Sequence, residues 1–163
     1  MIAVQFLSKI TSRARLVYMS LNELTGKIVV SSSSAELYSK YPFKYLKTND
    51  YIFNNKHIIH ICITSYGGGI ISGDNGYFHW KLLNGSTARF YTNGTSKVFK
   101  RIEDRICNQQ LLCEIENDTL LCYLPDSTAL FRGASLAQKQ IIFLESSARL
   151  VFNCCIGLPA NCM

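Results

Sequence analysis

The residues with the clearest potential for chemistry lie in the segment SYGGGIISGD, which spans Ser65 to Asp74. Three consecutive glycines are typical of a phosphate-binding loop, in which backbone N–H groups and one lysine surround a phosphate at a helix N-terminus. Here no Lys-Ser or Lys-Thr pair follows Gly73, and the next residues alternate as in a strand. The segment TNGTSK, from Thr92, also continues as strand. The sequence therefore argues against a nucleotide site in either segment.

Ser72 is a candidate nucleophile of a hydrolase. The nucleophile elbow G-x-S-x-G is absent, because Ser72 lies in the sequence GIISG. Its nearest partners by type, Asp74 and His79, fall on the same predicted hairpin, whereas a catalytic triad needs a histidine and an acid that converge from elsewhere in the fold. The sequence therefore does not predict serine hydrolysis.

Histidines and cysteines are the candidate ligands for a metal. His57 and His60 point to opposite faces of the strand predicted there, so the sequence does not predict a joint site. His79 with Asp74, and the tail CCIGLPANC with its three cysteines, could each bind a soft or borderline metal. For the tail we favour free thiols. The cysteines of the tail are Cys154, Cys155 and Cys162.

Asp74 and Asp126 each lie in a turn at the edge of a predicted strand, in the sequences SGDNG and LPDST. The favoured interpretation is structural, because aspartate in a turn usually accepts hydrogen bonds from neighbouring backbone N–H groups. The functional alternative is a hard, oxygen-rich surface that passes a divalent cation or meets a partner. Both interpretations stay open at this point.

Composition predicts one folded domain. The chain has 163 residues, of which 48% are hydrophobic and 17% charged, so it can bury enough apolar surface to offset the entropy of ordering. No apolar run approaches the roughly 20 residues that cross a bilayer, so no transmembrane segment is predicted. The seven cysteines include no C-x-x-C pair and follow no secretory signal, which favours reduced thiols and a cytoplasmic location. Among them, Cys62, Cys107, Cys113 and Cys122 lie within apolar segments and are predicted core residues.

The first twenty residues contain no acid, which leaves an organelle transit peptide as an alternative to a first strand. The net charge of +6 and the pI near 9.0 would suit nucleic acid. However, the basic residues are scattered, and the densest group, within Lys97–Arg105, contains two acids. A solvated face is therefore favoured over a phosphate-binding stripe.

Period-2 alternation and β-branched residues predict strands along most of the chain. The predicted strands are 15–20, 27–31, 57–65, 76–82, 88–92, 109–115, 120–124, 140–146 and 148–152. Asn84-Gly85, Asn93-Gly94 and Asn117-Asp118 predict turns, which favour hairpins and meanders. Residues 31–47 read as an irregular arm, with a short helix possible at Ala35. Strand spacing alone leaves a sandwich, a barrel or a spiral open.

Five ordered blocks nevertheless resemble one family, the urease accessory protein D family, also called H. The blocks are YPFKYLK from Tyr41, SYGGGIISGD from Ser65, TNGTSKVFK from Thr92, LPDSTALFRGASLAQKQIIFL from Leu124 and SSARLVF from Ser146. The resemblance covers 1–152 and corresponds to the N-terminal part of a family member. After ARLV the family usually continues with Asp-Trp, whereas this chain reads FNCCIGLPANCM, so 153–163 is predicted to be a divergent tail and the fold to be incomplete at its C-terminal end.

The resemblance implies an all-β fold built as a spiral, β-helix-like stack of strands with few short helices. It also implies a scaffold or metallochaperone that is not an enzyme and that helps to insert nickel into apo-urease. The partners implied are urease accessory proteins F and G, the latter a GTPase, and apo-urease, with no nucleic acid and no membrane. No tightly bound cofactor is implied, only Ni²⁺ in transit. Two alternative hypotheses remain: a basic nucleic-acid-binding β module, and a truncated, non-functional fragment.

The resemblance also nominates residues. The triple glycine is then expected to be a tight backbone crossing between packed strands. A nickel route lined or supported by ligands of modest affinity would draw on Ser72, Asp74, Thr95, Ser96 and Asp126. The resemblance implies no fixed metal site; Asp74 and Asp126 are its candidates for transient contact with the metal. The full set of residues expected to serve the nickel route or a partner is Gly67, Gly68, Gly69, Ser72, Gly73, Asp74, Thr95, Ser96, Lys97, Asp126, Phe131 and Gln138.

Overall fold

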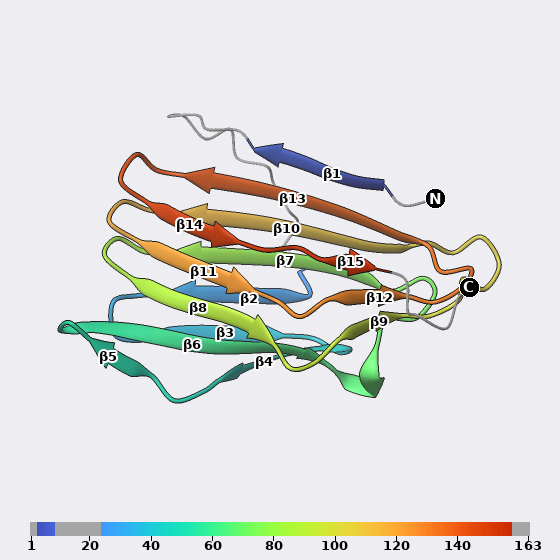
Figure 1. Ribbon diagram of the computed structural model, residues 1–163, viewed down its shortest axis with the longest axis horizontal. Helices are drawn as coiled ribbons and strands as arrows, with labels where there is room; N and C mark the ends of the chain where they lie inside the picture. Colours follow the sequence, from blue (N-terminus) through green and yellow to red (C-terminus); the bar gives the residue numbers. More distant parts are fainter. Residues whose placement is uncertain (1–2, 9–23, 158–163) are drawn as a thin grey trace.

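Alternating apolar and polar residues form strands throughout the computed structural model, which describes residues 3–8 and 24–157 (Figure 1). The first six strands are Ala3–Ser8 (β1), Gly26–Val30 (β2), Ala35–Ser39 (β3), Phe43–Lys47 (β4), Tyr51–Phe53 (β5) and Lys56–Ser65 (β6). After a single 3₁₀ turn at Tyr66–Gly68 come Asn75–Leu82 (β7), Thr87–Thr92 (β8), Ser96–Val98 (β9), Cys107–Ile115 (β10), Leu120–Leu124 (β11), Thr128–Leu130 (β12), Leu136–Leu144 (β13), Arg149–Phe152 (β14) and Ile156–Gly157 (β15).

The strands make three sheets. Sheet A has the order β1-β13-β10-β7-β2-β3, sheet B the order β14-β11-β8-β6-β4 with β5 also paired to β6, and sheet C the order β15-β12-β9. From β7 onward the chain visits sheets A, B and C in that order three times, so each circuit of roughly 30 residues adds one strand to every sheet. The fold is a β-solenoid of about three turns, with its strands stacked in parallel (Figure 1).

Parallel, in-register pairing stacks equivalent positions of successive turns. Phe78 of β7 pairs with Leu111 of β10, which pairs with Gln140 of β13, and all three side chains face the interior. The corners between sheets A and B stack as well, because Asn117 N donates to Glu145 Oε2 at 2.8 Å and its carbonyl accepts from Gly85 N at 3.1 Å. Backbone hydrogen bonds therefore run along the axis of the stack.

Two apolar clusters fill the solenoid. The larger lies between sheets A and B and is centred on Trp80 and Phe90, whose rings meet edge to face at 5.1 Å. The smaller lies beside sheet C and consists of Ile70, Val98, Cys107, Leu130 and Leu136. In the part of the chain that the structure describes, no helix has the length and apolar character needed to span a bilayer.

The spiral, all-β architecture implied by the family resemblance is confirmed, and the predicted strands within the described ranges are present with small shifts of their ends. The largest shift concerns β13, which begins at Leu136 rather than at Gln140. The predicted strand 15–20 lies outside the described residues. The predicted turns at Asn84, Asn93 and Asn117 are present, with positive φ at Gly85, Gly94 and Asp118.

Two local predictions are wrong. The meander of hairpins is replaced by parallel stacking, since the predicted turns lead from one sheet to the next instead of returning to the same sheet. Antiparallel pairs are found only for β2–β3, β4–β6 and β5–β6 among the described strands. The arm 31–47 contains the strands β3 and β4 and no helix at Ala35, because its alternating side chains pack one face of each strand on the core.

Candidate functional site: an oxygen-lined cavity between the sheets

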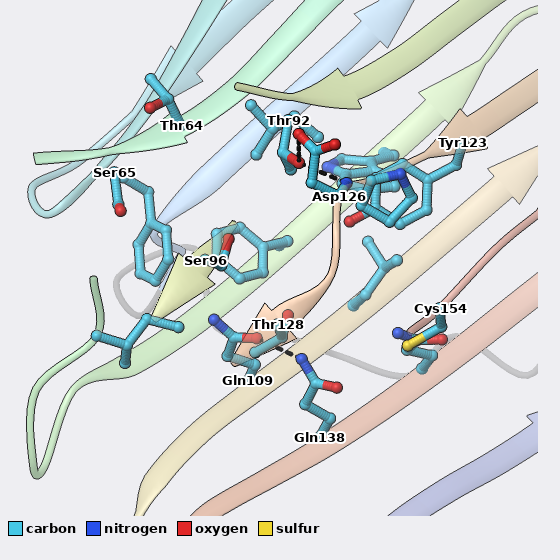
Figure 2. A pocket seen from close by; sticks show the side chains of 18 of the residues that line it. Thr64, Ser65, Thr92, Ser96, Gln109, Tyr123, Asp126, Thr128, Gln138 and Cys154 are labelled. Carbon is cyan, nitrogen blue, oxygen red and sulfur yellow. Dashed lines mark hydrogen bonds between the residues drawn. The ribbon is translucent and has the colours of Figure 1, made fainter. Parts of the chain in front are cut away.

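A cavity of about 120 Å³ lies between the two apolar clusters, where sheets A, B and C meet (Figure 2). Aromatic side chains from the larger cluster, among them Tyr45 and Trp80, close one end, and Ile70 of the smaller cluster lies at the other. All three sheets contribute lining residues because every strand directs alternate side chains inward. The cavity is therefore a product of the solenoid fold.

Oxygen-bearing side chains converge on this cavity from all three sheets (Figure 2). They are supplied by Ser65 and Thr92 from sheet B, Ser96 and Thr128 from sheet C, Gln109, Gln138 and Gln140 from sheet A, and Asp126 from the β11–β12 connection. Hydroxyls and carboxamides are neutral, hard donors, which suit hydrated divalent cations without holding them tightly.

Asp126 is exposed at the rim of the cavity, and hydrogen bonds hold it in place. Its Oδ2 accepts from Gly94 N at 2.7 Å and from Thr92 Oγ1 at 3.2 Å. In turn, Asp126 N donates to Thr92 Oγ1 at 2.8 Å. These bonds are the structural role that turn aspartates usually have, and they fix the one carboxylate among the lining residues at the rim (Figure 2).

Glutamines of sheet A form the polar wall opposite. Gln138 Nε2 donates to Gln109 Oε1 at 2.7 Å across the β10–β13 pair (Figure 2). The Oε1 atoms of Gln138 and Gln140 are buried and have no hydrogen-bond partner among the described residues. An unpaired buried carboxamide oxygen costs roughly 1–3 kcal/mol. The fold tolerates two of them beside the cavity.

Ionisation is suppressed around the cavity. Burial raises the pKa of the Tyr45 phenol well above its usual range, although Trp80 Nε1 donates to Tyr45 Oη at 3.3 Å and acts in the opposite direction. Burial also raises the pKa of Tyr123 and, with the neighbouring Cys155, that of Cys154. These groups are neutral at pH 7, and among the described residues that line the cavity Asp126 is the one acidic side chain.

No trio of His, Cys, Asp or Glu side chains in residues 3–8 and 24–157 is arranged to hold a metal ion. His79 binds Glu114 through Nε2 at 2.6 Å instead of approaching Asp74. The geometry of the described part of the chain fits a polar passage better than a tight metal centre.

Ser72, Gly73 and Asp74 lie at a corner of the solenoid and do not line the cavity. Ser72 Oγ accepts from Ile102 N at 3.0 Å and lies 2.9 Å from Arg105 O, to which it donates. Asp74 Oδ2 accepts from Ile71 N at 3.0 Å within its own turn. Both side chains bind the backbone of the corner outside the cavity, and their part in a nickel route stays a prediction.

We expect Ser72→Ala to lower the free energy of unfolding by about 1–2 kcal/mol, because the substitution leaves backbone groups of the 99–106 loop without their partner. Urea denaturation followed by circular dichroism measures the change. Ser33→Ala is the control, since Ser33 is exposed. Equal midpoints for the two variants would show that this serine does not hold the corner together.

The three glycines have different roles. Gly67 and Gly68 adopt φ of 73° and 72° in an exposed turn, a conformation that L-residues rarely take. Gly69 is buried, and a Cβ there would lie 2.6 Å from Phe99 Cε2 and 2.7 Å from Lys97 O. The expected close backbone crossing is thus made by Gly69, while its two neighbours shape the turn that precedes it.

The remaining nominated residues separate into two groups. Ser96 and Gln138 line the cavity with Asp126, whereas Thr95 and Lys97 are exposed and lie outside it. Phe131 stacks on Phe99 at a ring distance of 5.4 Å, beside Gly69.

Sequence reasoning missed part of the polar wall. It did not nominate Gln109, Gln140, Ser65 or Thr128, all of which line the cavity. One signal was available: polar glutamines occupy the inward positions of strands that are otherwise rich in leucine and isoleucine. A buried glutamine needs a partner, and two such residues at equivalent positions of successive turns provide one for each other.

Comparisons with known proteins agree with one another. The family model described as UreD urease accessory protein matches residues 13–160. Urease accessory protein D of Arabidopsis thaliana is 35% identical over 132 residues, which cover 78% of this chain and 45% of the relative. The protein of that name from Oryza sativa subsp. indica is 26% identical over 125 residues, with 77% and 41% covered. Urease accessory protein UreD of Sorangium cellulosum is 29% identical over 91 residues, with 56% and 28% covered. The chain therefore spans less than half the length of the curated relatives it matches.

Proposed function

The chain belongs to the UreD urease accessory protein family, and from that premise we propose that it acts in urease maturation, as a non-enzymatic scaffold through which nickel reaches apo-urease. Nickel is the cargo in this proposal and is not a resident cofactor. The family assignment supports the maturation role, and the cavity supports the passage of a cation.

The polar cavity is the observation that carries the cation route. A cation in transit needs ligands that replace part of its hydration shell and then release it, which neutral hydroxyls and carboxamides do better than thiolates or imidazoles. Ser96, Thr128, Gln109 and Gln138 offer such groups in one place, with Asp126 as the single carboxylate at the rim. The raised pKa of Cys154 keeps that nearby thiol protonated, so it does not compete as a soft ligand.

The proposal also includes the partner proteins and the cellular compartment. Accessory protein F, the GTPase accessory protein G and apo-urease are the proteins with which a nickel scaffold for urease would assemble, and the cytoplasm is the compartment that we propose for this assembly. The free cysteines at 62, 107, 113, 122, 154 and 155 are compatible with a reducing compartment.

Complementation tests this proposal. We expect the chain to restore urease activity in cells that lack their own homologue of the family. Gln138→Leu should lower the restored activity and the nickel content of urease about tenfold, because an added barrier of about 1.4 kcal/mol for a cation that passes an apolar wall slows transfer by that factor. Urease activity in extracts and nickel by mass spectrometry are the two measurements.

Thr95→Val is the control for this experiment, since Thr95 is exposed and does not line the cavity. No activity with the wild-type chain would overturn the maturation role. Full activity and nickel content with Gln138→Leu, at equal protein abundance, would overturn the cavity as the route.

A further inference from the structure

The outer face of sheet B carries two continuous rows of side chains that point away from the core. The first row crosses the strands as Val151, Cys122, Arg89 and His60, each directly paired with the next. The second row runs as Leu124, Tyr91, Cys62 and Leu46, again by direct pairing. The residues between them along each strand belong to the interior, so these eight residues define one face, which we call the outer B face; Cys62 on this face is covered by its neighbours and only 6% exposed.

Large apolar side chains on the outer B face and its β5 extension are exposed. Val151 is 50% exposed, Leu46 40% and Leu124 39%, and on β5 Tyr51 and Phe53 reach 63% and 67%. Val151 and Leu124 lie on the adjacent strands β14 and β11, and Leu46 lies on β4 at the opposite edge of the same sheet. Exposed apolar side chains gathered on one face of a sheet often mark an interaction site.

Aromatic contacts link the two rows to the edge strand β5. The Tyr51 ring lies 5.3 Å from the His60 ring, and the Arg89 guanidinium lies 5.4 Å from the centre of the Tyr91 ring. Burial, and next to it the charge of Arg89, lower the pKa of His60 below its usual value, so this imidazole is neutral at pH 7. Arg89 is therefore the one charged side chain in the two rows.

Charge on sheet B has a single sign. Strands β4, β5, β6, β8, β11 and β14 contain no aspartate or glutamate. Their charged residues are Lys44, Lys47, Lys56, Arg89 and Arg149. Asp50, between β4 and β5, pairs with Lys47 at 2.9 Å. Sheet A differs, because Glu114 of β10 faces His79 of β7 there.

We propose that the outer B face is a docking surface for another protein, whose complementary patch carries acidic side chains that meet Arg89 and the lysines of β4 and β6, and apolar side chains that meet Val151, Leu124 and Leu46. Charge complementarity selects this occupant over a second copy of the chain, since two identical basic faces would repel each other. The exposed aliphatic side chains of Val151, Leu124 and Leu46 favour a protein over nucleic acid, because they offer no ring on which a base can stack. The choice of binding probes below rests on the proposed function.

The test measures binding of purified accessory protein F, accessory protein G and apo-urease to the 163-residue chain by biolayer interferometry at low and at physiological salt. We expect one of the three to bind, with lower affinity at the higher salt concentration. Arg89→Glu and Val151→Asp should each weaken that binding at least about tenfold, because one reverses the charge at the middle of the face and the other places a charge among the exposed apolar side chains at its β14 edge. Lys27→Glu, the same kind of charge change on sheet A, should bind as the wild type does.

Thermal unfolding of each variant separates a lost contact from a lost fold, and both substituted side chains are exposed. Unchanged binding by both folded variants would overturn the docking surface, and so would wild-type binding to none of the three probes. Two other results would also overturn it: a concentration-dependent dimer that Val151→Asp dissolves, or binding of polyuridylate RNA or phosphatidylserine vesicles that Arg89→Glu abolishes while protein binding persists.

The experiments distinguish failure of the docking surface from failure of the nickel route. If Arg89→Glu binds normally and restores urease activity while Gln138→Leu does not, the docking surface is wrong and the nickel route stands. If the wild-type chain restores no activity but binds a probe through the outer B face, the route is wrong and the surface stands.

Discussion

Phe90→Ala is expected to lower the free energy of unfolding by about 3–5 kcal/mol, among the largest effects for a single residue of this chain. Phe90 has no exposed surface, and its ring meets Trp80 edge to face at the centre of the larger cluster. The substitution removes the apolar surface of the ring and leaves a void between sheets A and B that the parallel strands cannot close. Urea denaturation monitored by Trp80 fluorescence and by circular dichroism measures the loss.

Phe53→Ala is the matched control, because Phe53 is 67% exposed on β5 and has no place in either apolar cluster. We expect its effect on stability to stay within about 0.5 kcal/mol. Comparable losses for the two phenylalanines would contradict the assignment of the core to the space between the sheets.

Gly69→Ala should destabilise the fold by about 2–3 kcal/mol, although it adds only one methyl group. Gly69 has an extended backbone that alanine adopts freely, so the cost comes from the space around it. Its new Cβ would meet Lys97 O, which already accepts Ile70 N at 2.7 Å, and the edge of the Phe99 ring. The Lys97 carbonyl is part of the backbone and cannot move aside as an exposed side chain can. Thermal denaturation should therefore show a lower unfolding midpoint for Gly69→Ala than for the wild type.

Gly157→Ala provides the comparison, since Gly157 also has an ordinary φ but faces open space. Its stability should match the wild type within about 0.5 kcal/mol. A loss at Gly69 no greater than that at Gly157 would mean that the corner moves to admit the methyl group, and the close crossing of backbone would then not be a packing constraint.

The sequence predicts local backbone conformation correctly where a conformation requires a particular residue type. Asn84-Gly85 and Asn93-Gly94 predicted turns, and both glycines adopt positive φ. The β-branched segment 57–65 predicted a strand, and β6 forms there with Ile59 and Ile61 buried. These predictions hold because they depend on a few adjacent residues.

The sequence does not predict which strands pair with each other. Asn-Gly turns favour hairpins when two strands lie beside each other, but here Gly85 leads from sheet A into sheet B. The parallel partner of β7 is β10, about 30 residues away, and that partner is specified by the inward side chains of both strands and not by the turn. The family resemblance supplied the spiral that propensity left open.

The same difference between local and long-range contacts explains which residues of the cavity the sequence nominated. Asp126 was predicted as either a turn residue or a metal ligand, and the structure shows it bonded to Gly94 and Thr92 at the cavity rim. Gln138 was nominated through the resemblance, whereas its partner Gln109 was not, since the contact joins strands of successive turns. Ser72 and Asp74 were nominated through the resemblance and their oxygen atoms, and the structure shows that both bind the backbone of a corner.

The stacking of equivalent strands has a consequence for how the chain reaches this state. Each parallel contact joins residues that are distant in sequence, so the first pairing must close a long loop before any stacked layer stabilises it. Once one layer exists, it serves as a template, and the next layer adds to a preformed edge. We therefore expect a slow, nucleation-limited refolding phase followed by rapid growth of the stack along its axis.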